Sequence, residues 1–515
     1  MKRTFAVVAC VVTLLGLAPA AFAQAPAPKV TITGLFDQVT STGKNIYDGN
    51  FSRSSDQEWY ARTRFRPDFE FAVGRTKAVL GLEMDLTWGQ CGANDGGFPG
   101  NTSGTNSGCK GGSNGGFDIN TDVGGMIELK WMYTEFDLTG KDSLMPFIPV
   151  ATVARLGAQP FSTLGNYKVV YANGDFAGMS TRTTFAPNLA VALAYVQVEE
   201  EIAGGNRLVR TSGNRRGNDF AAIISPEITP FKGLDIKPVY SYFYAEGSTS
   251  GSSRRAVSNQ QGAVSPTEES RHTVGLDMRW RSGPFSLDPT VMYQFGEINQ
   301  RSAGTILHSD RSAWLFDVQG GWQLGPLLLE ARGVYTTGNK ASDDLRTEDR
   351  NYFDPLNLDT GYWSGWSNIQ ALGVDYFNGG GGTLAGMSTG IGYDRYGRMG
   401  FALRATYSIT PALAFYGIVS PTWTAEKVDT DTTSSATGRG APTAATNGGD
   451  SRYIGTEADL GMTWRFAPNT VFDLVGAYLF AGGALDTREA VAPTGTAERD
   501  SKDGWTVAAR VRLSF

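Results

Sequence analysis

The chain ends with Trp505-Thr506-Val507-Ala508-Ala509-Arg510-Val511-Arg512-Leu513-Ser514-Phe515, in which two kinds of side chain alternate. Every second residue from Trp505 to Phe515 is apolar, and the residues between them include Arg510 and Arg512. Because successive side chains of a strand point to opposite faces, this stretch predicts a strand with one apolar side and one polar, cationic side. A strand of a soluble β-sandwich can alternate in the same way, so the rest of the chain must decide the fold.

The same alternation recurs along the chain. It is clearest in residues 59–71, 80–88, 274–281, 285–295, 314–324 and 458–466. No apolar run is long enough to span a bilayer as a helix. A closed barrel is the structure that satisfies the backbone hydrogen bonds of strands in lipid. The sequence therefore predicts an all-β fold, a transmembrane antiparallel β-barrel.

Aromatic residues recur at the ends of the predicted strands, namely Trp59, Trp88, Trp280, Trp314, Trp464 and Trp505. Amphipathic rings are enriched where a membrane protein meets the headgroup layer. In a sandwich the aromatic residues would be expected in the middle of the strands, in the core. Their placement favours the membrane barrel.

Short and long connections alternate. The short ones contain Pro, Gly or Asn, which suit tight hairpins, and lie at 74–75, 186–188, 230–233, 282–284, 325–326, 410–411 and 467–469. The long ones, about 90–122, 202–217, 246–270, 297–311, 336–395, 425–452 and 481–503, are rich in Gly, Ser, Thr, Asn and charge. Barrels of this kind have short periplasmic turns and long extracellular loops. We predict about 18 strands, with 16 as the alternative, and both termini in the periplasm.

The N-terminus has the three parts of an export signal. Lys2 and Arg3 are followed by the apolar stretch 5–17 and by the small-residue site Ala21-Phe22-Ala23. An uncleaved anchor helix is the alternative, but the apolar stretch is short for a spanning helix. We expect residues 1–23 to be a cleaved signal peptide, residues 24–515 to form one barrel domain, and the protein to reside in the bacterial outer membrane.

Composition fits an exported barrel and excludes one class of partner. Hydrophobic residues make up 41% of the chain and the mean hydropathy is −0.22, because only alternate residues of a barrel face lipid. The formal charge of −6 argues against nucleic-acid binding.

Apart from Cys10 in the signal segment, the cysteines are Cys91 and Cys109, which we predict to form a disulfide within one loop. The two histidines, His272 and His308, show no catalytic context, and we expect no enzymatic activity, no cofactor and no metal. Residues 428–431 contain two aspartates, but they lack the Gly and Glu of a calcium-binding loop, and we interpret them as solvated loop.

Over nearly its whole mature length, the chain resembles the Gram-negative outer-membrane porins, and three short motifs carry this resemblance. They are Val30-Thr31-Ile32-Thr33-Gly34-Leu35-Phe36-Asp37 for the first strand, Arg155-Leu156-Gly157-Ala158-Gln159-Pro160-Phe161 for the fifth strand, and the terminal Arg512-Leu513-Ser514-Phe515. The resemblance implies a water-filled channel for small hydrophilic solutes, a homotrimer, and contact with outer-membrane lipid and lipopolysaccharide. It also implies an inward-folded third loop, here residues 160–175. This loop departs from the family's acidic pattern, since Asp175 is its only acid and Lys168 lies beside it.

Charges at the narrowest section of a pore set the barrier for ions. Our candidates for the pore lining are Arg62, Arg64, Arg66, Glu83, Asp85, Arg155, Lys168, Asp175, Arg279, Arg332, Arg404 and Arg510. Each arginine is either a solvated luminal residue paired with a carboxylate or a member of a ladder that selects solutes. The mixed charges favour a general diffusion pore. The alternative is a channel selective for an anionic solute, such as an oxyanion, or for a saccharide or polysaccharide, in uptake or export.

The loop at 336–395 is rich in aromatic residues, namely Tyr352, Phe353, Tyr362, Trp363, Trp366, Tyr376 and Phe377. Aromatic faces bind the apolar faces of sugars, so a saccharide path is one interpretation. A small packed plug or a contact within a trimer is the other.

Overall fold

A computed structural model of the chain describes residues 27–46, 51–52, 57–88, 127–162, 164, 167–168, 170–172, 174–199, 219–246, 266–302, 305–345, 347–356, 363, 365–370, 395–430, 449–490 and 496–515. The predicted signal peptide, Cys91, Cys109, Tyr362, Tyr376, Phe377 and Asp431 lie outside these residues.

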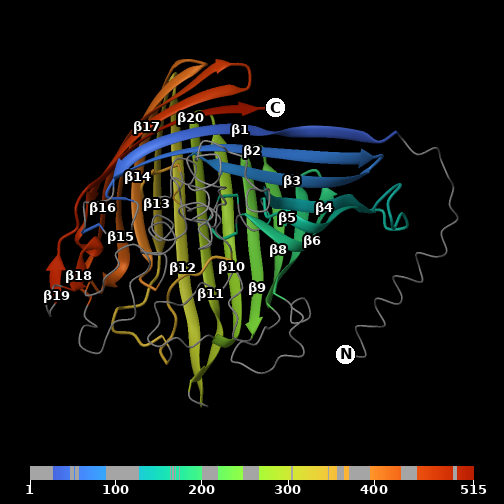
Figure 1. The fold of residues 1–515 in the computed structure, drawn as a ribbon. Helices are drawn as coiled ribbons and strands as arrows, with labels where there is room; N and C mark the ends of the chain where they lie inside the picture. Colours follow the sequence, from blue (N-terminus) through green and yellow to red (C-terminus); the bar gives the residue numbers. More distant parts are fainter. Residues whose placement is uncertain are drawn as a thin grey trace, which may run out of the picture.

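Within the described residues, 18 strands form one antiparallel sheet that closes on itself (Figure 1). Each strand from β1 to β16 pairs with the next along the chain, β17 pairs with β20, and β20 pairs with β1. The predicted β-barrel of 18 strands is confirmed, and the alternative of 16 is wrong. The strands are β1 (Lys29–Lys44), β2 (Gln57–Val73), β3 (Thr76–Thr87), β4 (Ile127–Thr139), β5 (Ala151–Pro160), β6 (Asp175–Ala186), β7 (Leu189–Glu199), β8 (Asp219–Phe231), β9 (Leu234–Glu246), β10 (Pro266–Ser282), β11 (Phe285–Ser302), β12 (Thr305–Leu324), β13 (Leu327–Thr336), β14 (Arg398–Thr410), β15 (Leu413–Val428), β16 (Ser451–Ala467), β17 (Thr470–Ala481) and β20 (Gly504–Ser514).

All seven predicted short connections join consecutive strands. At the β2–β3 turn, Gly74 adopts φ 61°, a conformation that glycine reaches without steric cost. At the β16–β17 turn, Asn469 adopts φ 55°, which asparagine tolerates better than most residues. The connection between β4 and β5, residues 140–150, is longer than these turns.

One long loop contains structure that the sequence did not predict. Residues 481–503 hold the short 3₁₀ helix η4 (Gly483–Leu485) and a separate hairpin of β18 (Thr487–Ala490) and β19 (Thr496–Arg499). Leu485 packs in a buried cluster with Ile46 and Phe51, from the β1–β2 connection. The loop therefore covers the neighbouring loop end of the barrel.

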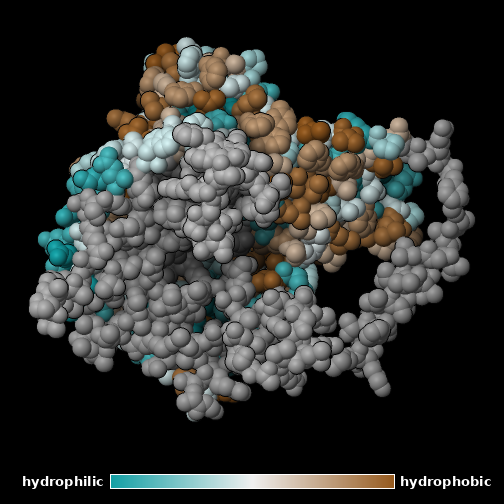
Figure 2. All heavy atoms as spheres, viewed as in Figure 1, coloured by the Kyte–Doolittle hydropathy of each residue, from teal (hydrophilic) through white to brown (hydrophobic). Residues whose placement is uncertain are grey.

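The two faces of the sheet differ as the alternation predicts. Large apolar side chains are exposed on the outside, including Leu460 at 75% and Phe185 at 57%. Figure 2 shows brown apolar side chains gathered on the right of the view, beside β3 and β4. Charged side chains such as Asp37, Arg62 and Asp277 are buried on the inside. Among the described residues, no helix is long and apolar enough to cross a membrane.

Candidate functional site

The inner wall of β2 and β3 carries the predicted charge ladder. Arg64 binds Asp85 through two nitrogens, at 2.7 and 2.6 Å, and its Nη2 also lies 2.8 Å from Glu83. Arg66 Nε lies 2.7 Å from Glu83, while Arg62 lies 3.9 Å from Asp85. Strand register explains this arrangement, because Arg64 pairs directly with Asp85 across the sheet. Each arginine of the ladder therefore has an acidic partner on the next strand.

The ladder continues around the seam where the barrel closes. Arg510 on β20 lies 2.8 Å from Asp473 on β17, and Arg512 lies 3.1 Å from Asp37 on β1. Asp37 in turn pairs in register with both Arg64 and Arg512. The alternating charges thus form one row across five neighbouring strands, β17, β20, β1, β2 and β3, which joins the two ends of the barrel sequence.

Two acids of this row are much more buried than the arginines that pair with them. The side chain of Arg66 is 33% exposed, whereas that of its partner Glu83 is 1% exposed. Arg512 is 30% exposed and its partner Asp37 is 1% exposed. At these two pairs the arginine is therefore the group that a solute meets, and the wall there is cationic.

A cavity of about 530 Å³ lies on the inner wall of β4–β8, at the start of the third loop. Arg155 lies 2.5 Å from Glu135 on one side of it, and Arg182 lies 2.8 Å from Glu227 on the other. Sequence reasoning identified Arg155 but missed Arg182 and Glu227, because Arg182 stands among threonines and Glu227 follows Pro226, so neither lies in a stretch of clear apolar–polar alternation. At 56% exposure, Arg182 is well placed to meet solutes.

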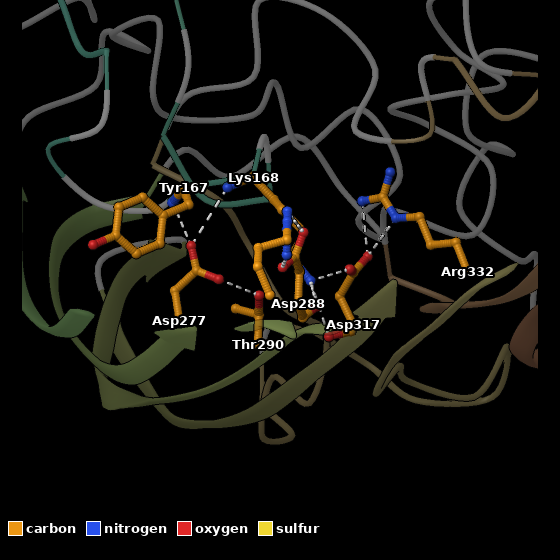
Figure 3. Close-up of polar contacts among 8 residues, drawn as sticks. Tyr167, Lys168, Asp277, Asp288, Thr290, Asp317 and Arg332 are labelled. Carbon is orange, nitrogen blue, oxygen red and sulfur yellow. Dashed lines mark hydrogen bonds and ion pairs between the residues drawn. The ribbon is translucent and has the colours of Figure 1, made fainter. Parts of the chain in front are cut away.

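The described part of the third loop lies inside the barrel and reaches the wall of β9–β12. The backbone N–H of Tyr167 donates to the carboxylate of Asp277, and Lys168 N–H lies 3.4 Å from the same oxygen (Figure 3). The Tyr167 ring packs against two cations, with Lys237 Nζ at 4.5 Å and the Arg279 guanidinium carbon at 4.2 Å from its centre. Burial raises the pKa of the Tyr167 hydroxyl to about 12, so the ring stays uncharged beside these cations.

The side chain of Lys168 ends among acceptors on β11 and β12. Its Nζ lies 2.6 Å from Asp317 Oδ1, 2.5 Å from the carbonyl oxygen of Asp288 and 3.2 Å from that of Asp317 (Figure 3). Asp317 Oδ2 accepts from Arg332 Nε at 2.9 Å. Lys168 is therefore neutralised at the wall rather than projecting freely into the lumen.

A second segment of chain occupies the lumen between β13 and β14. We call its described part, within residues 337–370, the luminal segment. Glu457 on β16 holds it by accepting three consecutive backbone N–H groups: Asn368 at 2.6 Å, Ile369 at 2.7 Å and Gln370 at 2.9 Å. The Asn368 side chain adds a bond of 2.8 Å to Asp459. Successive N–H groups that converge on a carboxylate form a firm anchor.

The described aromatic residues of this segment are packed rather than open. Trp363 is 0% exposed, and its Nε1 donates to Ser420 Oγ at 2.7 Å. Phe353 is also buried, and Tyr352 and Trp366 lie against Arg311 and Arg404. This arrangement favours the packed plug over a saccharide path along these rings.

The remaining predicted residues also lie on the inner wall. Arg404 lies 2.7 Å from Glu330, and its Nη1 donates to the carbonyl oxygen of Gly365 at 2.9 Å. Asp175, the first residue of β6, accepts from Trp131 Nε1 at 2.5 Å. Of the predicted set, the residues of β2, β3 and β20 form one group, whereas Lys168, Arg279 and Arg332 form another around the tip of the third loop.

The described histidines lie away from these groups. The His272 ring stacks on Phe295, 4.9 Å between centres, and its Nδ1 is 2.9 Å from the Tyr240 hydroxyl. In the part of the chain that the structure describes, no group of three or more His, Cys, Asp or Glu residues could hold a metal ion.

Comparisons with known proteins give fold neighbours only. No family model matches the sequence, and no curated protein sequence matches it. The structure is similar to crystal structures of three Pseudomonas aeruginosa proteins. OccK8 (OprE) is 12% identical over 95% of this chain and 98% of that chain, with a TM-score of 0.48. OpdQ is 10% identical over 94% of this chain and 97% of that chain, with a TM-score of 0.48, and the outer membrane protein OpdK is 8% identical over 95% of this chain and 99% of that chain, with a TM-score of 0.46. Because these identities are so low and the TM-scores are below 0.5, we draw no functional conclusion from the likenesses.

Proposed function

We propose that this chain is a bacterial outer-membrane porin, a water-filled channel through which small hydrophilic solutes and ions diffuse passively. The proposal rests on the difference in polarity between the outer and inner faces of the barrel. An apolar outer face suits lipid, and an inner face lined with ion pairs suits water. The third loop and the luminal segment both narrow the lumen, so the channel is a restricted one.

We further propose a mild preference for anions. Arg66, Arg155, Arg182 and Arg512 are each more exposed than the acid that they pair with. Charges that line a pore raise the barrier for ions of the same sign. If the channel is selective for one class of solute, this observation favours anionic solutes over saccharides.

The predicted surroundings of the barrel belong to the same proposal. We expect a cleaved signal peptide to direct the chain to the outer membrane, where the apolar face would contact lipid and lipopolysaccharide in a homotrimer. Chemical cross-linking of the detergent-extracted protein should give a band at three times the chain mass. A single-chain band under conditions that cross-link a known trimer would reject the trimer but not the channel.

Liposome swelling tests the proposed function. Vesicles that contain the folded protein should swell in iso-osmotic solutions of small neutral sugars, and the rate should fall steeply as the sugar grows. Vesicles with heat-unfolded protein serve as the control. If vesicles with folded protein swell no faster than this control, the chain is not a diffusion channel.

A further inference from the structure

The Nζ group of Lys168 occupies a complete ammonium site. It has three acceptors within hydrogen-bond distance, and all three belong to the wall rather than to the third loop. The Asp317 side chain is 0% exposed and Lys168 itself is 11% exposed. An ammonium group carries three N–H donors, so the number of acceptors matches the number of donors.

We propose that this part of the β11–β12 wall is a binding site for primary ammonium groups, and that Lys168 is its internal ligand. By binding there, Lys168 holds the third loop against the wall, a contact that we call the latch. The proposal rests on the proposed channel function, because the latch would set the width of that channel. The ligand class is a small primary alkylammonium ion, since such an ion presents the same donors as Lys168.

The wall explains why the ligand should be an ammonium ion with N–H groups. Arg332 already binds Asp317 Oδ2 at 2.9 Å, which leaves Oδ1 for Lys168. The other two acceptors are backbone carbonyl oxygens held in place by the sheet. A quaternary ammonium ion has no N–H to donate and is wider than the amine, so it cannot make these bonds.

The loop has a second contact that should remain when the first is lost. Tyr167 donates its backbone N–H to Asp277, whose other oxygen accepts from Thr290 Oγ1 at 2.6 Å. Loss of the Lys168 side chain should therefore loosen the tip of the loop without removing it from the lumen. An added amine could then refill the site and reduce the repulsion between unpaired acceptors.

Chemical rescue of Lys168→Ala tests the proposal. In planar bilayers the variant should show larger and noisier single-channel currents than the wild type. Added n-propylammonium should bring its currents back toward the wild-type value, and tetramethylammonium should not. Lys77→Ala is the matched control, because Lys77 pairs with Glu70 and Glu135 on the inner wall and takes no part in the contacts of Lys168.

The outcomes separate the two proposals. If the folded wild type does not conduct, the proposed function fails. If the wild type conducts but Lys168→Ala has wild-type currents, or if n-propylammonium acts equally on Lys77→Ala, the latch is wrong. Lys168→Met, which keeps an unbranched side chain, replaces the alanine variant if the latter fails to fold, and it should show the same enlarged, noisy currents. Wild-type currents in this variant would overturn the latch as well.

Discussion

Arg64 and Asp85 face one another across β2 and β3 and form a two-point ion pair, with Nε–Oδ1 at 2.7 Å and Nη2–Oδ2 at 2.6 Å. Both side chains are almost fully buried, at 6% and 5% exposure. Removing one partner of a buried pair leaves an uncompensated charge, whereas the pair as a whole contributes little net stability. The ladder is therefore better regarded as a device that fixes the field in the lumen than as a source of stability.

The double variant Arg64→Ala/Arg66→Ala tests the field of the ladder. Glu83 and Asp85 would lose close cationic partners, so the wall should become more acidic. We expect the reversal potential in a potassium chloride gradient to shift toward cation preference. Arg75→Ala is the control, because Arg75 lies in the β2–β3 turn and pairs with Asp137. A reversal potential equal to that of the wild type would reject a selective role for the ladder.

Glu457→Ala tests the anchor of the luminal segment. The substitution removes the acceptor of three backbone N–H groups, and each hydrogen bond to a charged group contributes about 1.5–3 kcal/mol. We expect the segment to leave the wall, the single-channel conductance to rise and the largest sugar that passes to increase in size.

Glu426→Ala provides the matched control for the anchor. Glu426 lies on the neighbouring strand β15 and pairs with Arg452 at 3.1 Å, away from residues 368–370. Both variants remove one carboxylate, and the two carboxylates lie on neighbouring strands. If they change conductance equally, the effect comes from lost charge and the anchor is not what narrows the channel.

Two substitutions on β5 test which face meets lipid. Leu156 is 44% exposed on the outer face, and Val153 is 37% exposed on the inner face beside the cavity. Leu156→Arg places a charge in hydrocarbon and should lower the free energy of unfolding by about 2–4 kcal/mol if it lies near the midplane. Val153→Arg should cost clearly less. Urea unfolding in lipid vesicles measures both, and equal losses would contradict the assigned faces.

The fold could be predicted because each strand carries its own signal. In β20 the alternation from Trp505 to Phe515 separates the apolar outer residues from Arg510 and Arg512, and the structure places these arginines beside Asp473 and Asp37. The turns could be predicted too, since Gly74 and Asn469 occupy positions with positive φ. Both signals are local, so one sequence is enough to find them.

The arrangement inside the barrel could not be predicted from such local signals. Lys168 and Asp317 are 149 residues apart in the sequence, and Tyr167 and Asp277 are 110 apart. Alternation assigns Asp317 to the inner face but does not reveal which loop reaches it. The partners of Glu457 could not be predicted either, because they are the backbone N–H groups of residues 368–370. Every residue except proline has such a group, so the sequence does not distinguish these three.

Single-channel recording of the purified wild-type protein tests the central claim most directly. Protein that migrates as a folded barrel before heating should give discrete conductance steps in a planar bilayer, with a reversal potential that indicates mild anion preference. The same folded protein giving no steps at any concentration would contradict the claim that this barrel encloses an aqueous path.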